Sequence, residues 1–112
     1  MRIDIKGRNV SVDDELRARV EKKFGKVAKQ VSPLAEMEIE LSEERNPSIK
    51  DSQVAEATLH VKGTTLRASE RSTDMLHSIN LVAEDLSRQV KRHREKRRKR
   101  RESAKAGQPR IA

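Results

Sequence analysis

Hydrophobic residues along this chain follow two different spacings, and these spacings divide it into six segments. Apolar and polar residues alternate over residues 2–6, 35–41, 54–62 and 65–69, which is the pattern of β-strands with one buried face. Over residues 14–31 and again over 75–90, apolar residues recur every three or four positions, as in amphipathic helices. The pattern therefore predicts a strand, a helix, three strands and a second helix.

The first predicted helix has a defined start and a defined end. Asp13 is the expected N-cap, with Ser11 as the alternative, and Pro33 ends the helix after Ser32. Its apolar stripe consists of Leu16, Val20, Phe24, Val27 and Val31. The opposite face carries Arg19, Lys22, Lys26 and Lys29, with Lys23 beside them. We expect this row of cations to face solvent.

The second predicted helix has two halves of different composition. Ser72 or Thr73 is its expected cap. The apolar stripe of the first half consists of Met75, Ile79, Val82, Ala83, Leu86 and Val90. No Gly or Pro lies between Gly63 and Gly107, so the helix can continue through residues 88–101. Residues 102–112 lack periodicity and are predicted to be a disordered tail, which leaves residues 1–101 as one domain with a basic helical extension.

These elements predict an α+β fold in the order β-α-β-β-β-α. The helix between the first two strands makes a crossover, so those strands should be parallel, and the later strands should form an antiparallel meander. Two helices then cover one face of a single four-stranded sheet. The other face carries Glu36, Glu38, Glu40, Glu56, Thr58 and His60. We expect that face to be acidic and to repel nucleic acid, so that binding uses the helices.

Charge is distributed unevenly along the chain. The formal net charge is +8, although residues 1–87 hold 14 basic and 16 acidic side chains. Residues 88–101 hold ten basic side chains and the single acid Glu95, a charge of +9. Such a block marks an interaction segment, and phosphate backbones are its commonest partner because neutralised phosphates release condensed counterions. A membrane is disfavoured, since residues 91–101 offer almost no apolar face to insert.

Composition argues against several classes of function. The chain has no cysteine, which removes disulfides, thiolate metal sites and thiol nucleophiles. Its histidines, at positions 60, 77 and 93, are far apart in the pattern, and no serine has a glycine-flanked elbow. We therefore expect no enzyme, no cofactor and no small-molecule substrate. The first ten residues lack an apolar signal segment and no apolar run has the length of a membrane span, so we expect a cytoplasmic protein.

If the helices pack side by side, their cations form one broad patch. At about 100° per residue, Arg88, Lys91, Arg92 and Arg98 point away from the apolar stripe of the second helix. Such a patch suits the closely spaced phosphates of folded RNA and recognises shape more than sequence. Phe24 is the sole aromatic residue, which argues against a single-strand binder that stacks bases. An ordinary solvated lysine face and a solubilising tail are the simpler alternatives.

Several segments, in this order and spacing, resemble the ribosome hibernation-promoting factors, also called ribosome-associated inhibitors. They are IDIKGRNV at 3–10 followed by Leu16, EKKFGKV at 21–27, ATLHVKG at 57–63, and LRASERSTDM at 66–75 followed by SINLVAEDLSRQVKRHREK at 78–96. The most specific portion is Asp74-Met75 followed by Ile79, Leu86, Arg88-Gln89 and a basic–His–basic run at 92–94. The resemblance covers residues 1–97. It implies the same β-α-β-β-β-α fold, which is similar to that of double-stranded RNA-binding domains.

The resemblance implies a translation silencer. Members of that family bind the small ribosomal subunit between head and body, over the mRNA path and the A- and P-site tRNA positions, and contact ribosomal RNA with cations of both helices. Matched onto this chain, those cations are Lys22, Lys23, Lys26, Arg88, Lys91, Arg92, Arg94 and Lys96. The run 97–101 is more basic than is usual in the family. We therefore add Arg97 and Arg98 to the expected RNA-binding set, together with Arg19 and Lys29.

This chain departs from the family pattern at Leu76, where tyrosine is usual. The long form of the family adds a C-terminal dimerisation domain, which this sequence lacks; we therefore expect a short or truncated form that is monomeric. Two other hypotheses stay open. The chain is a general module or chaperone for structured RNA, or it is an adaptor whose basic segment docks on an acidic protein.

Overall fold

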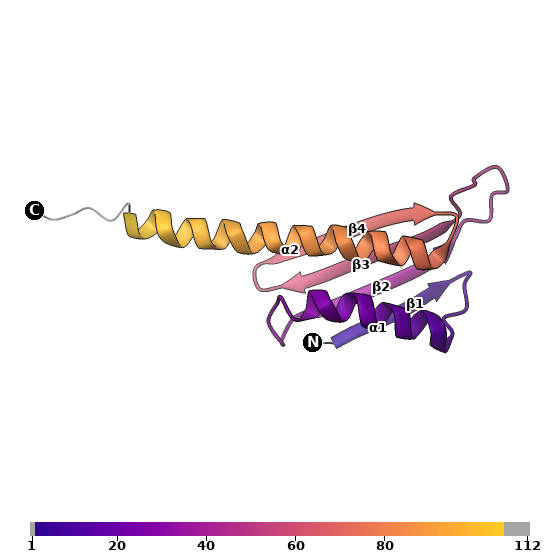
Figure 1. Cartoon of the computed structure of the whole chain (residues 1–112), viewed down its shortest axis with the longest axis horizontal. Coiled ribbons are helices and arrows are strands. Elements are labelled where there is room, and N and C mark those ends of the chain that lie inside the picture. Colours follow the sequence, from indigo (N-terminus) through magenta and orange to yellow (C-terminus); the bar gives the residue numbers. More distant parts are fainter. Residues whose placement is uncertain (1, 107–112) are drawn as a thin grey trace, which may run out of the picture.

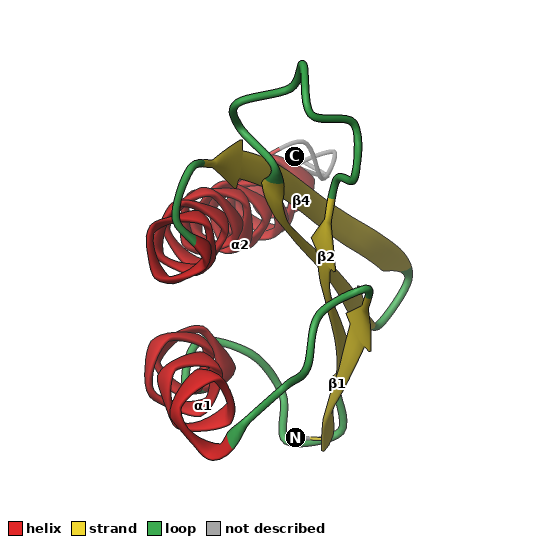
Figure 2. Cartoon of the chain, turned by 90° about the vertical axis from the view of Figure 1, so that its right-hand side faces the viewer, coloured by secondary structure: helices red, strands yellow, loops and turns green. Residues whose placement is uncertain are grey.

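The computed structural model describes residues 2–106 and shows a four-stranded sheet with both helices on one face (Figures 1 and 2). The elements are β1 (Arg2–Arg8), α1 (Asp14–Ala28), β2 (Glu36–Glu43), β3 (Gln53–Val61), β4 (Thr64–Ser72) and α2 (Met75–Ala106). This is the predicted β-α-β-β-β-α order, and the predicted α+β class is confirmed.

The sheet has the strand order β1-β2-β3-β4. β1 pairs with β2 in parallel, with Ile3 opposite Met37, because α1 carries the chain back to the edge of the sheet at which β1 begins. β2, β3 and β4 form the predicted antiparallel meander. The turn between β3 and β4 contains Gly63 at φ 81°, a conformation that is costly for residues with a Cβ.

A hydrophobic core fills the space between the helices and the sheet. The two helices contribute Val20, Phe24, Val27, Ile79, Val82, Leu86 and Val90. The sheet contributes Met37, Ile39, Leu41, Ala55, Ala57 and Leu59. Phe24 and Leu86 are fully buried, so the predicted stripes on both helices are the faces that pack inward.

Helix α1 begins as predicted but ends earlier than predicted. The carboxylate of Asp13 accepts a hydrogen bond of 2.8 Å from the amide of Leu16, which is the expected N-cap. The helix ends at Ala28, because the next backbone bonds, Gln30 to Val27 and Val31 to Ala28, span only three residues and tighten the last turn. Val31 lies outside the helix yet still packs against the core.

Helix α2 begins directly after Asp74, so neither predicted cap residue lies immediately before it. Ser72 belongs to β4, where its hydroxyl donates to the Asp74 carbonyl oxygen at 2.7 Å and lies 2.7 Å from the buried Ser78 hydroxyl. Ser78 in turn donates to the carbonyl oxygen of Gln53 at 2.6 Å. These bonds attach the first turn of α2 to the end of the sheet.

Helix α2 also ends later than predicted. Residues 102–106 are helical, so the prediction that a disordered tail begins after Arg101 is wrong for these five residues. Alanine and lysine are good helix formers, and the first helix breaker is Gly107. The remainder of the predicted tail, residues 107–112, lies outside the described residues.

The long helix gives the molecule an elongated outline of 70 × 29 × 17 Å. Figure 1 shows that α1 and the sheet cover the first part of α2, whereas its later turns project past them. We call residues 91–106 of α2 the extension and the rest of the described chain the body. Within residues 2–106, no helix has both the length and the apolar character needed to cross a bilayer.

Candidate nucleic-acid interface

The predicted cations of α1 lie on the outward side of the helix, with different exposure. Lys22, Lys26 and Lys29 are exposed, whereas Arg19 and Lys23 are half-buried. The exposed residues occur at positions i, i+4 and i+7, opposite the buried Val20, Phe24 and Val27. The prediction of a solvent-facing row therefore holds for three lysines and only in part for Arg19.

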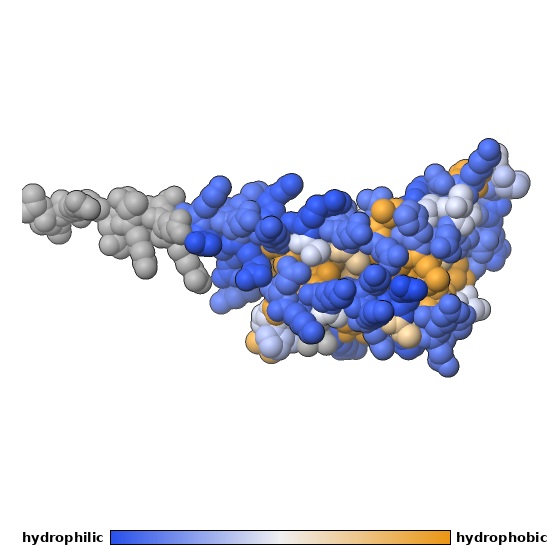
Figure 3. Space-filling model, in the orientation of Figure 1, coloured by the Kyte–Doolittle hydropathy of each residue, from blue (hydrophilic) through white to orange (hydrophobic). Residues whose placement is uncertain are grey.

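The predicted cations of α2 are all exposed. They are Arg88, Lys91, Arg92, Arg94, Lys96, Arg97 and Arg98. Arg88 follows the last turns that bury Leu86 and precedes the buried Val90, so the cationic segment starts while the helix is still packed on the body. Figure 3 shows the helical face of the molecule, where hydrophilic residues cover the visible side of the part of α2 that projects past the body.

The two helices run in the same direction across the sheet (Figure 1). The side-chain amide of Gln30, just after α1, donates a hydrogen bond of 3.2 Å to the hydroxyl of Ser87 on α2. The end of α1 therefore lies next to the point where the cations of α2 begin. The exposed lysines of α1 consequently lie near the start of the cationic segment of α2, and the extension carries positive charge beyond the end of α1.

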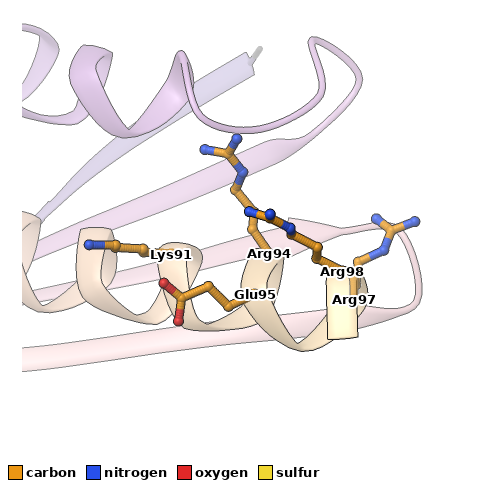
Figure 4. Close-up of a pocket in the computed structure, with 5 residues that line it drawn as sticks. All are labelled: Lys91, Arg94, Glu95, Arg97 and Arg98. Carbon is orange, nitrogen blue, oxygen red and sulfur yellow. The ribbon is translucent and has the colours of Figure 1, made fainter. Parts of the chain in front are cut away.

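An open hollow of about 570 Å³ lies along the extension and is lined by Lys91, Arg94, Glu95, Arg97 and Arg98. In Figure 4, the guanidinium groups of Arg94, Arg97 and Arg98 point outward from the helix, and Glu95 is the acid among four cations. Guanidinium groups bind phosphate oxygens through pairs of hydrogen bonds. The hollow can therefore receive phosphate groups rather than a neutral ligand.

Several cations on the helical side of the molecule have no acid among the described residues close enough to neutralise them. Within the described part of the chain, none of Lys22, Lys26, Arg88, Lys91 and Arg92 lies within 4.0 Å of a carboxylate oxygen. A salt bridge of 3.5 Å joins Arg2 to Asp4 on β1, on the opposite side of the molecule. Crowded, unpaired cations cost folding energy, and binding of a polyanion relieves their repulsion.

The open face of the sheet differs from the prediction. The register places the predicted Glu36, Glu38, Glu40, Glu56, Thr58 and His60 on this face, in the two central strands. The edge strands add Asp4 and also five cations: Arg2, Lys6, Arg8, Arg67 and Arg71. Five acids thus meet five bases, so the prediction of an acidic face is wrong for the face as a whole. Strand-by-strand inspection missed this balance because it arises only when the edge strands pair with the centre.

Sequence reasoning also missed a groove between the two helices. This groove, of about 260 Å³, is lined by Lys23, Lys26, Val27, Asn80, Ala83, Glu84 and Ser87. The Oδ1 atom of Asn80 is buried and accepts no hydrogen bond. A signal was present, because positions 80, 84 and 87 form a polar line at i, i+4 and i+7 beside the apolar stripe. Over the residues that the structure describes, no group of His, Asp and Glu could hold a metal ion.

Residues 3–98 match the family described as sigma 54 modulation protein / S30EA ribosomal protein. The chain belongs to this family. Curated relatives are named ribosome hibernation promotion or promoting factors, so the resemblance predicted from the sequence is confirmed. The match includes α1, β2, β3 and β4 in full and most of β1 and α2, and it ends within the extension.

Two relatives illustrate the extent of the family match. A ribosome hibernation promotion factor of Picosynechococcus is 34% identical over 97 residues, which are 86% of this chain and 50% of that protein. A ribosome hibernation promoting factor of Azotobacter vinelandii is 33% identical over 96 residues, which are 86% of this chain and 85% of that protein. The chain thus spans half the length of one relative and most of the length of the other.

Solved structures share the fold of this family member. The N-terminal domain of Thermus thermophilus Protein Y has a TM-score of 0.70 and 26% identity, and the match covers 83% of this chain and 99% of that domain. A ribosomal subunit interface protein from Coxiella burnetii has a TM-score of 0.71 at 22% identity, over 85% of this chain and 99% of that one.

Leu76, the departure noted in the sequence, is half-buried in the first turns of α2.

Proposed function

We propose that this chain is a cytoplasmic ribosome hibernation factor that binds the small ribosomal subunit as a monomer. The proposed site is the channel between the head and the body of the subunit, over the mRNA path and the A- and P-site tRNA positions. Support comes from membership of the family and from relatives named as hibernation factors. A protein in that channel silences translation by excluding mRNA and tRNA, without any reaction of its own.

The observation that carries this proposal is the placement of the cations. The hydrogen bond between Gln30 and Ser87 holds the end of α1 beside α2, which supports a surface to which cations of both helices contribute. In the proposed complex, Lys22, Lys23, Lys26 and Lys29 contact ribosomal RNA from α1, with the half-buried Arg19 at the edge. From α2 the contacts come from Arg88, Lys91, Arg92, Arg94, Lys96, Arg97 and Arg98.

The shape of the molecule suits a narrow site lined with RNA. The extension is a single helix with exposed cations, and the molecule as a whole is thin, with a smallest dimension of 17 Å. Lysine and arginine contacts with phosphates fix position and orientation but distinguish base sequences poorly. Selectivity for the ribosome then comes from the fit of a rigid shape into folded RNA.

Sedimentation with purified ribosomal subunits tests the proposal. We expect one chain to co-sediment with each small subunit and to be displaced by mRNA with initiator tRNA. Tight binding to naked duplex RNA, as strong as to the subunit, would instead support a general module for structured RNA. Binding to a protein partner that survives nuclease treatment would support the adaptor hypothesis.

A further inference from the structure

The groove between α1 and α2 differs chemically from the cationic surface around it. Lys23 and Lys26 line its α1 side, whereas Asn80, Glu84 and Ser87 line its α2 side. Its remaining lining residues, Val27 and Ala83, are apolar. In Figure 3, apolar residues are visible in a strip between the hydrophilic rows of the two helices. The groove thus combines cations, hydrogen-bond acceptors and an apolar floor.

The acceptors are the informative part of this combination. The Oδ1 atom of Asn80 is shielded from water and has no hydrogen-bond partner. A buried acceptor without a partner is costly, and such atoms in native proteins call for an explanation. A phosphate group cannot supply the partner, because at neutral pH its oxygens accept hydrogen bonds rather than donate them. A ligand that satisfies Asn80 has to bring a donor.

The carboxylate of Glu84 also favours a ligand that brings a hydrogen-bond donor. This exposed carboxylate lies in the groove beside the lysines, yet no salt bridge within the described residues joins it to Lys23 or Lys26. A carboxylate repels a phosphate and accepts hydrogen bonds from hydroxyl or amino groups. The α1 side of the groove therefore favours an anion, and the α2 side favours a neutral donor close to that anion.

We propose that this groove holds one nucleotide of RNA, with its phosphate on Lys23 and Lys26 and a donor group on Asn80. The donor is the ribose 2′-hydroxyl or a base amino group, both of which lie within one nucleotide of a phosphate. The 2′-hydroxyl can donate and accept, which also suits the hydroxyl of Ser87. This inference rests on the proposed function, since it names the part of RNA that the same surface recognises.

Binding requires the groove to open slightly, and its composition permits this. Asn80 is half-buried and its Oδ1 atom is covered, and three of the other residues that line the groove, Lys23, Lys26 and Glu84, have long side chains. Such side chains change rotamer within nanoseconds. A phosphate that draws the two ammonium groups to itself leaves the amide accessible to the neighbouring donor.

Chemical probing of the small subunit tests this inference. Subunits saturated with protein are treated with a reagent that acylates 2′-hydroxyls and, separately, with dimethyl sulfate, which methylates the pairing edges of adenine and cytosine, and with kethoxal, which modifies the pairing edge of guanine. We expect the wild type to protect one nucleotide that becomes reactive again with Asn80→Ala. The affinity of that variant for the subunit should fall by about five- to tenfold, the scale of one neutral hydrogen bond.

Two further variants separate the alternatives. Asn80→Gln keeps a neutral amide acceptor and should keep the protection, whereas Asn46→Ala, in the loop between β2 and β3, should change neither reactivity nor affinity. Renewed acylation assigns the donor to the ribose, and renewed modification of the base edge assigns it to the base. The inference is overturned if wild type and Asn80→Ala give identical patterns at saturation, or if Asn80→Gln loses protection as fully as Asn80→Ala. Failure of the wild type to co-sediment at all would overturn the proposed function instead.

Discussion

The two halves of α2 belong to one uninterrupted helix but are held by different forces. From Met75 to Val90 the helix buries a stripe that includes Ile79 and Leu86, both fully inaccessible to solvent. From Lys91 to Arg100 every residue except the half-buried His93 is exposed, and ten residues contain eight cations. The first half is stabilised by packing, whereas the second half depends on intrinsic helix propensity against the repulsion of its own charges.

Together with the proposed function, this difference predicts that stability and RNA binding depend on separate parts of one helix. Substitutions in the first half should lower the free energy of unfolding and should weaken RNA binding only through loss of the fold. Substitutions in the second half should weaken RNA binding and leave the fold intact. The following experiments test this division, from the largest expected effect to the smallest.

Leu86→Ala should produce the largest loss of stability. The side chain is fully buried in the core, so its removal leaves a cavity and should lower the free energy of unfolding by about 2–5 kcal/mol. Urea denaturation followed by circular dichroism measures this. Arg94→Ala, in the extension, is the matched control and should change stability by less than about 0.5 kcal/mol. Equal losses from the two variants would show that the extension is part of the cooperative core.

Reversing charge at the base of the extension should produce the largest loss of binding. The double variant Lys91→Glu/Arg92→Glu should weaken binding to the small subunit by about 100-fold, from roughly 1.5 kcal/mol for each charge-assisted contact that is lost. Sedimentation over a protein titration gives the affinity, and a thermal melt confirms folding. Arg67→Glu/Arg71→Glu makes the same charge change on the open face of the sheet. If that control binds as weakly, the helical face is not the interface.

Neutralising two cations further along the extension should change the salt dependence of binding. Each phosphate contact contributes roughly 0.7–0.9 to the slope of log affinity against log salt, so Lys96→Gln/Arg97→Gln should lower the slope by about 1.5. Affinities measured at several salt concentrations give the slope. Arg45→Gln/Lys50→Gln, in the loop between β2 and β3, removes the same charge and should leave it unchanged. An unaltered slope in the first variant would show that Lys96 and Arg97 do not contact RNA phosphates.

Gly25→Ala should produce the smallest effect and should act on the body alone. Gly25 lies inside α1, a Cβ at this position meets no atom within 4 Å, and its φ angle is not positive. Alanine should therefore raise the free energy of unfolding by about 0.5–1 kcal/mol, because glycine loses more backbone entropy on folding. Denaturant titration measures the gain. Destabilisation would mean that the helix needs glycine there for a reason that the packing does not show.

Sequence reasoning predicted the fold well because local patterns determine most of it. The carboxylate of Asp13 at the start of α1, the parallel crossover and the stripe that includes Phe24 and Leu86 follow from spacing and residue type. The ends of the helices followed less well, because they depend on small energy differences between backbone hydrogen-bond patterns. Ala28 ends α1 through short-range bonds, and Ala106 lies just before a glycine.

Features that arise only from tertiary contacts could not be predicted. The balance of charge on the open face depends on which residues of the edge strands, such as Arg8 and Arg71, align with the central glutamates. The groove around Asn80 exists only because α1 packs beside α2 in a particular alignment along the helix axes. The hydrogen bond between Gln30 and Ser87 shows which residues of the two segments lie side by side. By contrast, the cationic segments were evident from the sequence, and the prediction that both helices cover one face of the sheet already placed the two helices side by side.

The continuity of α2 has a consequence for the energetics of RNA recognition. Starting a helix is costly, since several residues must be ordered before the first hydrogen bond forms. Here the packed turns anchored by Ser78 and Leu86 provide that nucleus, and the charged turns propagate from it. An isolated arginine-rich peptide of the same sequence would spend part of its binding energy on ordering itself. In this chain the helix is already ordered before binding, because the folding of the core supplies its first turns.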